Sequence, residues 1–184
     1  MTQTIRHQLR KDALNARQQL AAADRAEFES RINALLSEHA SFQTQGMIAG
    51  YTPIKGEVDI TPFLRARAIC ALPRVIDDHT MVFHSVDDQT QLIANKWGIP
   101  EPDPALHPVF NDIEVILLPL VAFDRMGHRL GMGAGYYDRY LATFEPRPFC
   151  CGVAFACQEV TEIPDEEWDQ ALDAVVTEAG IIEF

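Results

Sequence analysis

A buried type of strand, a glycine-rich loop and a helix follow one another in the middle of the chain. Residues 114–118 are strongly apolar and are closed by Pro119, a pattern that suits the centre of a parallel sheet. The segment RLGMGAGYYDR follows at 129–139, and the stretch GYYDRYLATF that begins within it has the spacing of an amphipathic helix. A strand that leads through a loop into a helix is typical of α/β proteins.

Three further helices are predicted in the first third of the chain. Apolar residues three and four positions apart predict a helix over 4–20. A second helix is predicted to open at Asp24, in a capping arrangement with Glu27. The pair Thr61-Pro62 has the pattern of a helix cap followed by proline, and predicts a short helix over 62–67.

Short apolar runs between these helices predict the remaining strands. They lie at 47–51, 69–72, 80–86 (antiparallel), 151–156, 174–177 and 181–184. The stretch 95–112 is too rich in proline to predict regular structure. We therefore expect one domain, residues 1–184, folded as a three-layer α/β/α sandwich with a mostly parallel central sheet.

The composition excludes several classes of protein. A formal net charge of −12 argues against nucleic acid or an anionic membrane as the main partner. No 18-residue apolar stretch occurs, and the first residues lack the apolar core of a signal peptide, so we expect a cytoplasmic protein and a monomer. The four cysteines form no CxxC pair and the histidines are scattered, which predicts reduced thiols and no structural zinc.

The glycine-rich segment is the best candidate for a ligand site. Gly131, Gly133 and Gly135 alternate with other residues, and such a backbone can turn tightly and approach a ligand. Arg129 and Arg139 bracket the loop, and the start of the following helix favours an anion. The segment is neither a Walker A loop nor a dinucleotide fingerprint. A tight bend without a ligand is the alternative reading.

Several other charged residues have two readings. Asp138 in the first helical turn suits either a divalent cation held against phosphate or a favourable charge at the helix start. Arg6, Arg10 and Arg17 share one helical face, which either contacts an anion or is simply solvated. Asp169 is a second carboxylate that could meet a metal ion.

Three segments that follow predicted strands are expected to meet in one cleft, because open α/β sheets bind ligands at the carboxyl ends of their strands. They are TPIKGE with Lys55 and Glu57, the pair ending in Arg74, and the stretch leading into the glycine loop. Trp97 is either a plug over the core or a stacking surface for a flat heterocycle. Asp124 and Arg125 either orient the loop or stabilise a turn.

Taken together, these residues resemble one family. The chain carries Arg6-x-x-x-Arg10, YTPIKGEVD at 51–59, PR at 73–74, WGIPEP at 97–102, LPLVAFDRMGHRLGMGAGYYDRYL at 118–141, GVAFACQ at 152–158 and EEWDQALDAVVTE at 166–178. This series is similar to the 5-formyltetrahydrofolate cyclo-ligases, also called 5,10-methenyltetrahydrofolate synthetases, over nearly the whole chain. The resemblance implies a fold related to sugar-phosphate isomerases.

The resemblance also implies an activity and a set of site residues. The activity is the ATP- and Mg²⁺-dependent conversion of 5-formyltetrahydrofolate to 5,10-methenyltetrahydrofolate, by phosphorylation of the formyl oxygen and attack by N10. The implied ATP-binding residues are Arg6, Arg10, Arg129, Leu130, Gly131, Met132, Gly133, Ala134, Gly135, Tyr136 and Tyr137. The implied folate-binding residues are Thr52, Glu57, Trp97, Met132, Gly133, Ala134, Gly135 and Tyr136.

For the chemistry itself, the resemblance implies Arg129, Asp138 and Arg139 as catalytic residues, and Asp138 and Asp169 as Mg²⁺ ligands. The family often has lysine where this chain has Arg6, and Met132 and Ala134 also depart from it, which places more of the charge neutralisation on Arg129 and Arg139.

Two other functions remain open on the residues alone. One is a sugar-phosphate isomerase or deaminase that needs no ATP, and the other is a nucleotide or folate sensor without turnover. A nucleophilic hydrolase is poorly supported, because the chain lacks GxSxG and an obvious Cys–His pair.

Overall fold

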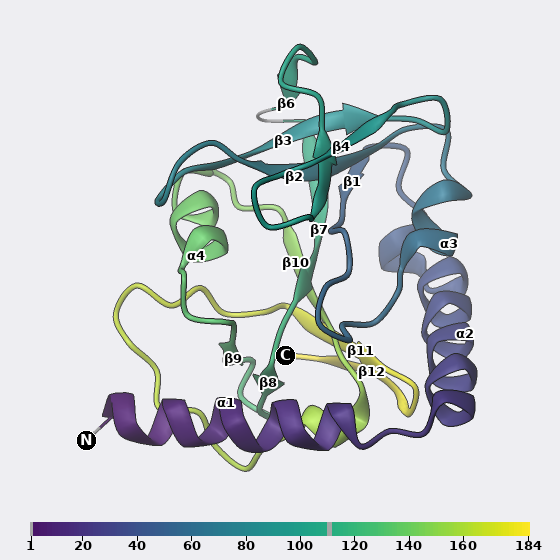
Figure 1. Cartoon of the computed structure of the whole chain (residues 1–184). Coiled ribbons are helices and arrows are strands. Elements are labelled where there is room, and N and C mark those ends of the chain that lie inside the picture. Colours follow the sequence, from purple (N-terminus) through teal and green to yellow (C-terminus); the bar gives the residue numbers. More distant parts are fainter. Residues whose placement is uncertain (1, 110–111) are drawn as a thin grey trace.

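An eight-stranded sheet crosses the centre of the protein, with helices on both of its faces (Figure 1). The computed structural model describes residues 2–109 and 112–184. The strands of this sheet are β1 (Met47–Ala49), β2 (Cys70–Val75), β3 (Met81–Val86), β6 (Pro108–Val109), β7 (Ile113–Pro119), β10 (Phe149–Val153), β11 (Ala174–Thr177) and β12 (Gly180–Glu183). Two small pairs stand outside it: β4 (Leu92–Ala94) with β5 (Pro100–Pro102), and β8 (Ala122–Phe123) with β9 (Arg129–Leu130).

The helices complete the three layers. They are α1 (Thr2–Gln18), α2 (Ala22–Glu38), α3 (Thr61–Arg65) and α4 (Tyr136–Leu141), with short 3₁₀ turns η1 (Ala40–Phe42) and η2 (Ala156–Gln158). Helices α2 and α3 cover one face and α4 the other, while α1 runs along the end of the molecule next to β8 and β9 (Figure 1). The expected α/β/α sandwich is confirmed. Among the described residues, no helix is long and apolar enough to cross a membrane.

The strand order is β12-β11-β10-β7-β1-β2-β3-β6. Strands β11, β10, β7, β1 and β2 run parallel, and β12, β3 and β6 pair antiparallel at the two edges. The predicted central strand is β7, which lies between β10 and β1 and is parallel to both. The carboxyl ends of the parallel strands therefore point to one end of the sheet, where α1 lies (Figure 1).

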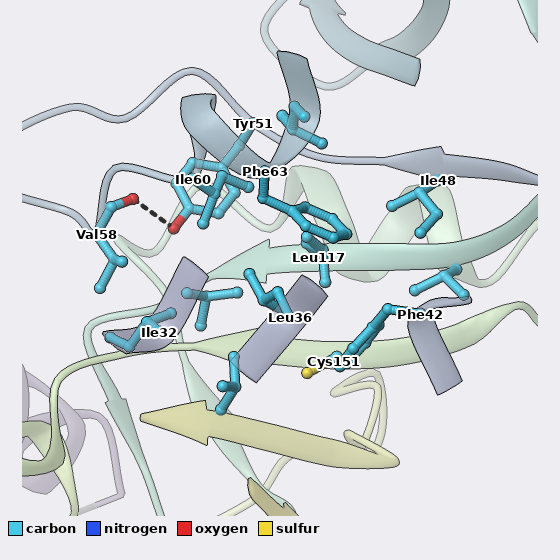
Figure 2. Close-up of a cluster of buried hydrophobic side chains, with 14 of the residues drawn as sticks. Ile32, Leu36, Phe42, Ile48, Tyr51, Val58, Ile60, Phe63, Leu117 and Cys151 are labelled. Carbon is cyan, nitrogen blue, oxygen red and sulfur yellow. Dashed lines mark hydrogen bonds between the residues drawn. The ribbon is translucent and has the colours of Figure 1, made fainter. Parts of the chain in front are cut away.

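Strand β7 supplies the core on both sides of the sheet, because successive side chains of a strand point to opposite faces. Leu117 packs in the cluster under α2, with Ile32, Leu36 and Phe42 (Figure 2). Its neighbour Leu118 packs in the other cluster, under α4. Both leucines have no exposed surface. A strand buried on two faces must be apolar at every inner position, which is why this run was readable in the sequence.

Several predicted boundaries were wrong, for local reasons. Helix α2 begins two residues before Asp24, with Ala21 at its N-cap and no side-chain cap. Helix α3 already includes Thr61; the side chain that accepts the Thr61 N–H is that of Asp59, at 2.8 Å. Helix α4 ends at Leu141, so it is shorter than the amphipathic pattern predicted.

The proline-rich stretch 95–112 is also more regular than expected, where it is described. Strands β4 and β5 form a two-stranded antiparallel hairpin, and β6 pairs with β3 and forms the edge of the large sheet. Prolines are tolerated there because these strands are short and lie at edges. Residues 110–111 of that stretch lie outside the described part of the chain.

Candidate active site

One cleft of about 1460 Å³ opens at the carboxyl ends of the parallel strands. Its lining comes from segments that are far apart in the chain: α1, the loop after β1, the exit of β7 at Pro119–Val121, the β4–β5 hairpin, the glycine loop with α4, and residues 166–170. The expected convergence of strand-following loops is thus confirmed for the segments after β1 and β7. Pro73 and Val75 of β2 also line the cleft, whereas Arg74 does not.

The glycine loop joins β9 to α4 and lies in the wall of this cleft. Gly133 and Gly135 have φ values of +100° and +69°, which residues with a side chain rarely adopt. The Arg10 Nε donates to the Gly131 carbonyl at 2.8 Å, and the Arg139 Nη2 donates to the Ala134 carbonyl at 2.8 Å. Helix α4 has only six residues. Its dipole is therefore small, and the arginines supply most of the positive charge.

Two buried arginines of the cleft are held by the two predicted metal ligands. Arg129 donates from Nη2 to Asp138 Oδ1 at 2.6 Å, and Arg6 from Nη1 to Asp169 Oδ2 at 2.5 Å. Arg6 also donates to the Pro164 carbonyl at 2.8 Å, which fastens α1 to the segment before Asp169. Burial opposes the charge of Arg6, but the hydrogen bond and charge of Asp169 outweigh it, so the pKa of Arg6 is raised.

Arg10 is in a different electrostatic position. It is half-buried, and among the described residues it forms no ion pair with a carboxylate. Burial, followed by the charge of Arg6, lowers the pKa of Arg10. A desolvated guanidinium beside a second one favours an anion between the loop and α1, and Arg–phosphate contacts are of this kind.

Asp138 and Asp169 are the residues that suit a divalent cation. No group of three or more His, Cys, Asp or Glu residues within the described ranges could hold a metal by itself. Mg²⁺, however, is commonly held by one or two carboxylates together with substrate phosphates and water. Both carboxylates line the cleft beside the glycine loop and the arginines. The donor set therefore fits a magnesium ion that arrives with a phosphate ligand.

The opposite part of the cleft is formed by the loop after β1. Ile54 N donates to Glu57 Oε2 at 3.0 Å and Glu57 N to the Ile54 carbonyl at 2.9 Å, which closes a turn around Lys55. Burial raises the pKa of Glu57, against the opposing effects of the Ile54 hydrogen bond and the charges of Arg17 and Lys55. Thr52 Oγ1 donates to the Pro100 carbonyl at 3.0 Å and so joins this loop to the β4–β5 hairpin.

Two tyrosines border the same region. The Tyr51 hydroxyl donates to the Val58 carbonyl at 2.8 Å and braces the loop from inside (Figure 2). Tyr137 lines the cleft at the start of α4. Desolvation, followed by the charge of Glu57, raises the pKa of the Tyr137 hydroxyl, so it remains a protonated hydrogen-bond donor.

Trp97 lies at the tip of the β4–β5 hairpin and lines the cleft with 54% of its surface exposed. The alternative of a plug over the core is wrong. The Lys96 Nζ lies 4.3 Å from the centre of the indole ring, and the exposed part of the indole is available for stacking on a flat ligand.

Most residues that the sequence singled out do meet in this cleft. They are Arg6, Arg10, Thr52, Lys55, Glu57, Trp97, Arg129, Gly131, Met132, Gly133, Ala134, Gly135, Tyr136, Tyr137, Asp138, Arg139 and Asp169. Leu130 is the exception among the ATP-binding residues: its side chain is fully buried in the cluster under α1 and does not line the cleft. It supports the loop from below.

Four other candidates have structural roles outside the cleft. Arg17 is buried rather than solvated, and it donates to the carbonyls of Lys55 and Leu120. Arg74 donates to a backbone carbonyl of β5. Arg125 pairs with a surface glutamate. Asp124 accepts hydrogen bonds from backbone N–H groups of its own turn, which agrees with the alternative that it stabilises a turn.

The sequence reading missed several lining residues. Gln3, Trp168 and Gln170 all face the cleft, and Tyr51 forms part of its wall. Trp168 stands beside Asp169 in EEWDQALD, so the signal was a large aromatic next to a candidate ligand in an irregular segment. Gln3 carried no such signal.

Fold and site together define an α/β protein with one large cleft, lined by arginines, a glycine loop and a glutamate-bearing loop. The chain belongs to the 5-formyltetrahydrofolate cyclo-ligase family, whose profile matches residues 2–178. It is an enzyme, a ligase of folate one-carbon metabolism.

Individual relatives agree with this assignment. The chain is 35% identical over 148 residues to the 5-formyltetrahydrofolate cyclo-ligase of Escherichia coli K12, covering 74% of this chain and 80% of that one. It is 32% identical over 179 residues to the Mycoplasma pneumoniae enzyme of that name, covering 92% and 96%. The solved structure of Aquifex aeolicus 5,10-methenyltetrahydrofolate synthetase superposes with a TM-score of 0.86 at 32% identity, covering 97% of this chain and 92% of that one.

Proposed function

We propose that the chain closes 5-formyltetrahydrofolate to 5,10-methenyltetrahydrofolate by phosphoryl transfer from ATP in this cleft, with release of ADP and phosphate. Membership of the cyclo-ligase family carries the conversion of 5-formyl- to 5,10-methenyltetrahydrofolate and implies the use of ATP. The observation that supports phosphoryl transfer in this cleft is the shared cavity: the proposed phosphate-binding elements and the Glu57 loop line one space of about 1460 Å³.

The chemistry explains why both ligands must meet. An oxygen at the formamide level is a very poor leaving group, so ring closure needs that oxygen activated first. Transfer of the γ-phosphoryl group to the formyl oxygen converts it into a phosphate leaving group. N10 then attacks the formyl carbon and releases its proton to water, the carbon–oxygen bond breaks, and phosphate departs with that oxygen. Such a sequence asks the protein for positioning and charge neutralisation more than for covalent chemistry.

At the phosphate end we assign ATP binding to the arginines and the glycine loop. Arg10 lies across the loop and carries a guanidinium without a carboxylate partner among the described residues, which suits the polyphosphate. Arg129, held by Asp138, supplies a fixed positive charge for the transferred group. Arg139 contacts the Ala134 and His79 carbonyls, so it shapes the loop while its charge adds to the field.

Asp138 and Asp169 are proposed to hold Mg²⁺ together with the ATP phosphates. When bound, the ion neutralises charge on the phosphates and fixes their orientation. The two aspartates also orient Arg129 and Arg6 through the ion pairs that they form. Loss of either carboxylate therefore affects an arginine as well as the metal.

At the other end we assign folate binding to Thr52, Glu57 and Trp97, with the Met132–Tyr136 loop near the formyl group. A half-buried carboxylate is a good acceptor for paired N–H donors of a pterin ring. The exposed indole of Trp97 offers a stacking face for the same ligand or its aromatic ring extension.

We also propose that the protein works in the cytoplasm as a monomer. The four cysteines are free thiols, three of them buried, as expected in a reducing compartment. A single chain contains every element that lines the cleft. A mass near 20.6 kDa by light scattering supports the monomer, and a mass near twice that value would contradict it.

Isotope transfer tests the proposed mechanism directly. With substrate labelled by ¹⁸O in the formyl group, we expect the released phosphate to carry one ¹⁸O for each methenyl product. Methenyl formation with unlabelled phosphate would show that the formyl oxygen is not phosphorylated.

A further inference from the structure

The chain contains two tryptophans, and both line the cleft. Trp97 lies on the β4–β5 hairpin, beside the loop after β1. Trp168 lies in the segment between η2 and β11 and is 63% exposed. Exposed indoles are unusual because their burial is strongly favourable. The first has a place in the proposed function, and the second has none so far.

The turn that carries Trp168 is firmly held although the indole is not. Asp169 N donates to the Glu166 carbonyl at 2.8 Å, and Glu166 N donates to Asp169 Oδ2 at 3.0 Å. The turn is tied to α1 by Arg6 and to α4 by the Gln170 N–H, which donates to Asp138 Oδ1 at 3.2 Å. Because the backbone of this turn is already fixed, the turn loses little conformational freedom when a flat ligand covers the ring.

The direction of the nucleotide follows from the reaction. The γ-phosphate must face the formyl group, which lies toward the Glu57 loop, so the base must extend from the glycine loop in the other direction. In Figure 1 the segment between η2 and β11 passes the N-terminal half of α1 and α4, away from the loop between β1 and α3. Among the aromatic residues in the described lining, Trp168 is the most exposed and the one that this segment contributes. Tyr51 and Trp97 lie on the loops at the proposed folate end, and Tyr136 and Tyr137 lie on α4 and are less exposed.

We infer that Trp168 stacks on the adenine base of ATP and ADP and so forms the base subsite of the cleft. The inference rests on the proposed function, since it takes the polyphosphate position from it. Stacking explains why a large apolar ring is kept exposed beside Asp169: the arginine that pairs with the proposed metal ligand also holds the turn that carries the ring. One turn of the chain thus carries both the stacking residue for the base and a proposed ligand of the metal ion that accompanies the phosphates.

The test compares a ligand that has the base with one that lacks it. ADP and pyrophosphate are titrated with Mg²⁺ by calorimetry into the unaltered protein, Trp168→Ala and Trp168→Phe. We expect Trp168→Ala to weaken ADP binding roughly 5- to 150-fold and to leave pyrophosphate binding unchanged, because a stacked base contributes about 1–3 kcal/mol. Trp168→Phe should keep part of the affinity. The control is Met126→Ala, which removes another exposed apolar side chain away from the cleft.

Fluorescence gives an independent readout without loss of the ring. In Trp97→Phe, Trp168 is the remaining tryptophan, and its emission should change with ADP but not with pyrophosphate. In Trp168→Phe, the emission of Trp97 should change with 5-formyltetrahydrofolate instead.

The outcomes separate the two claims. Unchanged ADP affinity in Trp168→Ala, or an equal loss for ADP and pyrophosphate, would overturn the base subsite alone. If the unaltered protein binds neither ADP nor pyrophosphate, the proposed function is overturned together with it.

Discussion

Two ion pairs, Arg6–Asp169 and Arg129–Asp138, set the charge that an incoming phosphate meets. Each ion pair holds a buried arginine against a carboxylate. The two guanidinium groups are therefore fixed in the cleft, although the protein as a whole has a net charge of −12. Arg10 differs from these two arginines. It donates to the glycine loop and forms no ion pair with a carboxylate within the described chain. A paired framework with one unpaired cation suits a ligand that brings both negative charge and a metal ion.

Replacement of Asp138 by alanine tests the metal role. We expect kcat at saturating Mg²⁺ to fall tenfold or more, equivalent to roughly 1.4 kcal/mol or more of lost transition-state stabilisation. The variant loses a proposed metal ligand and also frees Arg129. Asp165→Ala, an exposed carboxylate that does not line the cleft, is the matched control. Undiminished turnover in Asp138→Ala would remove Asp138 from the reaction.

Replacement of Glu57 by glutamine tests the folate end. The amide keeps the size of the side chain but not its charge, so a charge-assisted hydrogen bond to the substrate is lost. We expect the KM for 5-formyltetrahydrofolate to rise roughly tenfold, with a smaller change in the KM for ATP. Steady-state kinetics with each substrate varied in turn gives both constants. A larger effect on ATP would move Glu57 out of the folate site.

The same substitution should stabilise the protein at neutral pH. Burial raises the pKa of Glu57 above 4.5, so the folded state binds this proton more tightly than the unfolded chain does. That preference stabilises the fold at low pH and is lost as the pH rises through the raised pKa. We therefore expect Glu57→Gln to unfold at a higher temperature than the unaltered protein at pH 7, with the gap closing toward pH 4.5. Glu27→Gln, at an exposed position of α2, should show no gap at either pH.

At the residue scale, the sequence identified the residues that line the cleft better than the residues with which they pair. Residues 131–139 and Glu57 were found because glycines, arginines and acids cluster there, and all of them line the cleft. The pairing of Arg6 with Asp169 joins positions 163 apart, and no local pattern encodes such a contact. The burial of Arg17 was not predicted, because its two acceptors, the carbonyls of Lys55 and Leu120, come together only in the fold.

At the scale of elements, helix α1 connects the loops of the cleft through the hydrogen bonds of its arginines. Through Arg17 it holds the loop after β1 and the exit of β7, and through Arg10 it holds the glycine loop. Movement of these loops relative to the helix would break these hydrogen bonds. This explains how short, irregular segments keep a common geometry without secondary structure of their own.

Replacement of Arg17 by methionine should loosen this arrangement. The variant removes a buried guanidinium that donates to the carbonyls of Lys55 and Leu120. We expect the free energy of unfolding to fall by roughly 2 kcal/mol and the melting temperature by roughly 4–8 °C, measured by calorimetry. Arg31→Met, at an exposed position of α2, is the control. Equal melting temperatures for the two variants would show that the buried contacts contribute little.

The elements themselves were predicted to different degrees. Strand β7 and its parallel neighbours were readable because burial on both faces requires continuous apolar runs. The β4–β5 hairpin was not, because its prolines lie at strand edges where the usual rule against proline does not apply. The start of α2 at Ala22 was missed because no side-chain cap marks it.

At the scale of the whole molecule, the parallel sheet brings two chemistries to one end. The carboxyl ends of β1 and β7 deliver the Glu57 loop and the segment leading to the glycine loop into the same cleft. Under the proposed function, this cleft is where ATP and folate meet. The central claim is therefore that one cleft couples the phosphoryl donor to ring closure.

An omission assay tests that claim most directly. The absorbance of the methenyl product is followed with purified protein, 5-formyltetrahydrofolate, Mg²⁺ and ATP, and each component is left out in turn. We predict growth of the chromophore in the complete mixture only. Growth without ATP would contradict the phosphoryl-transfer account, and no growth from the complete mixture, with ATP and folate both bound, would make the protein a sensor rather than a ligase.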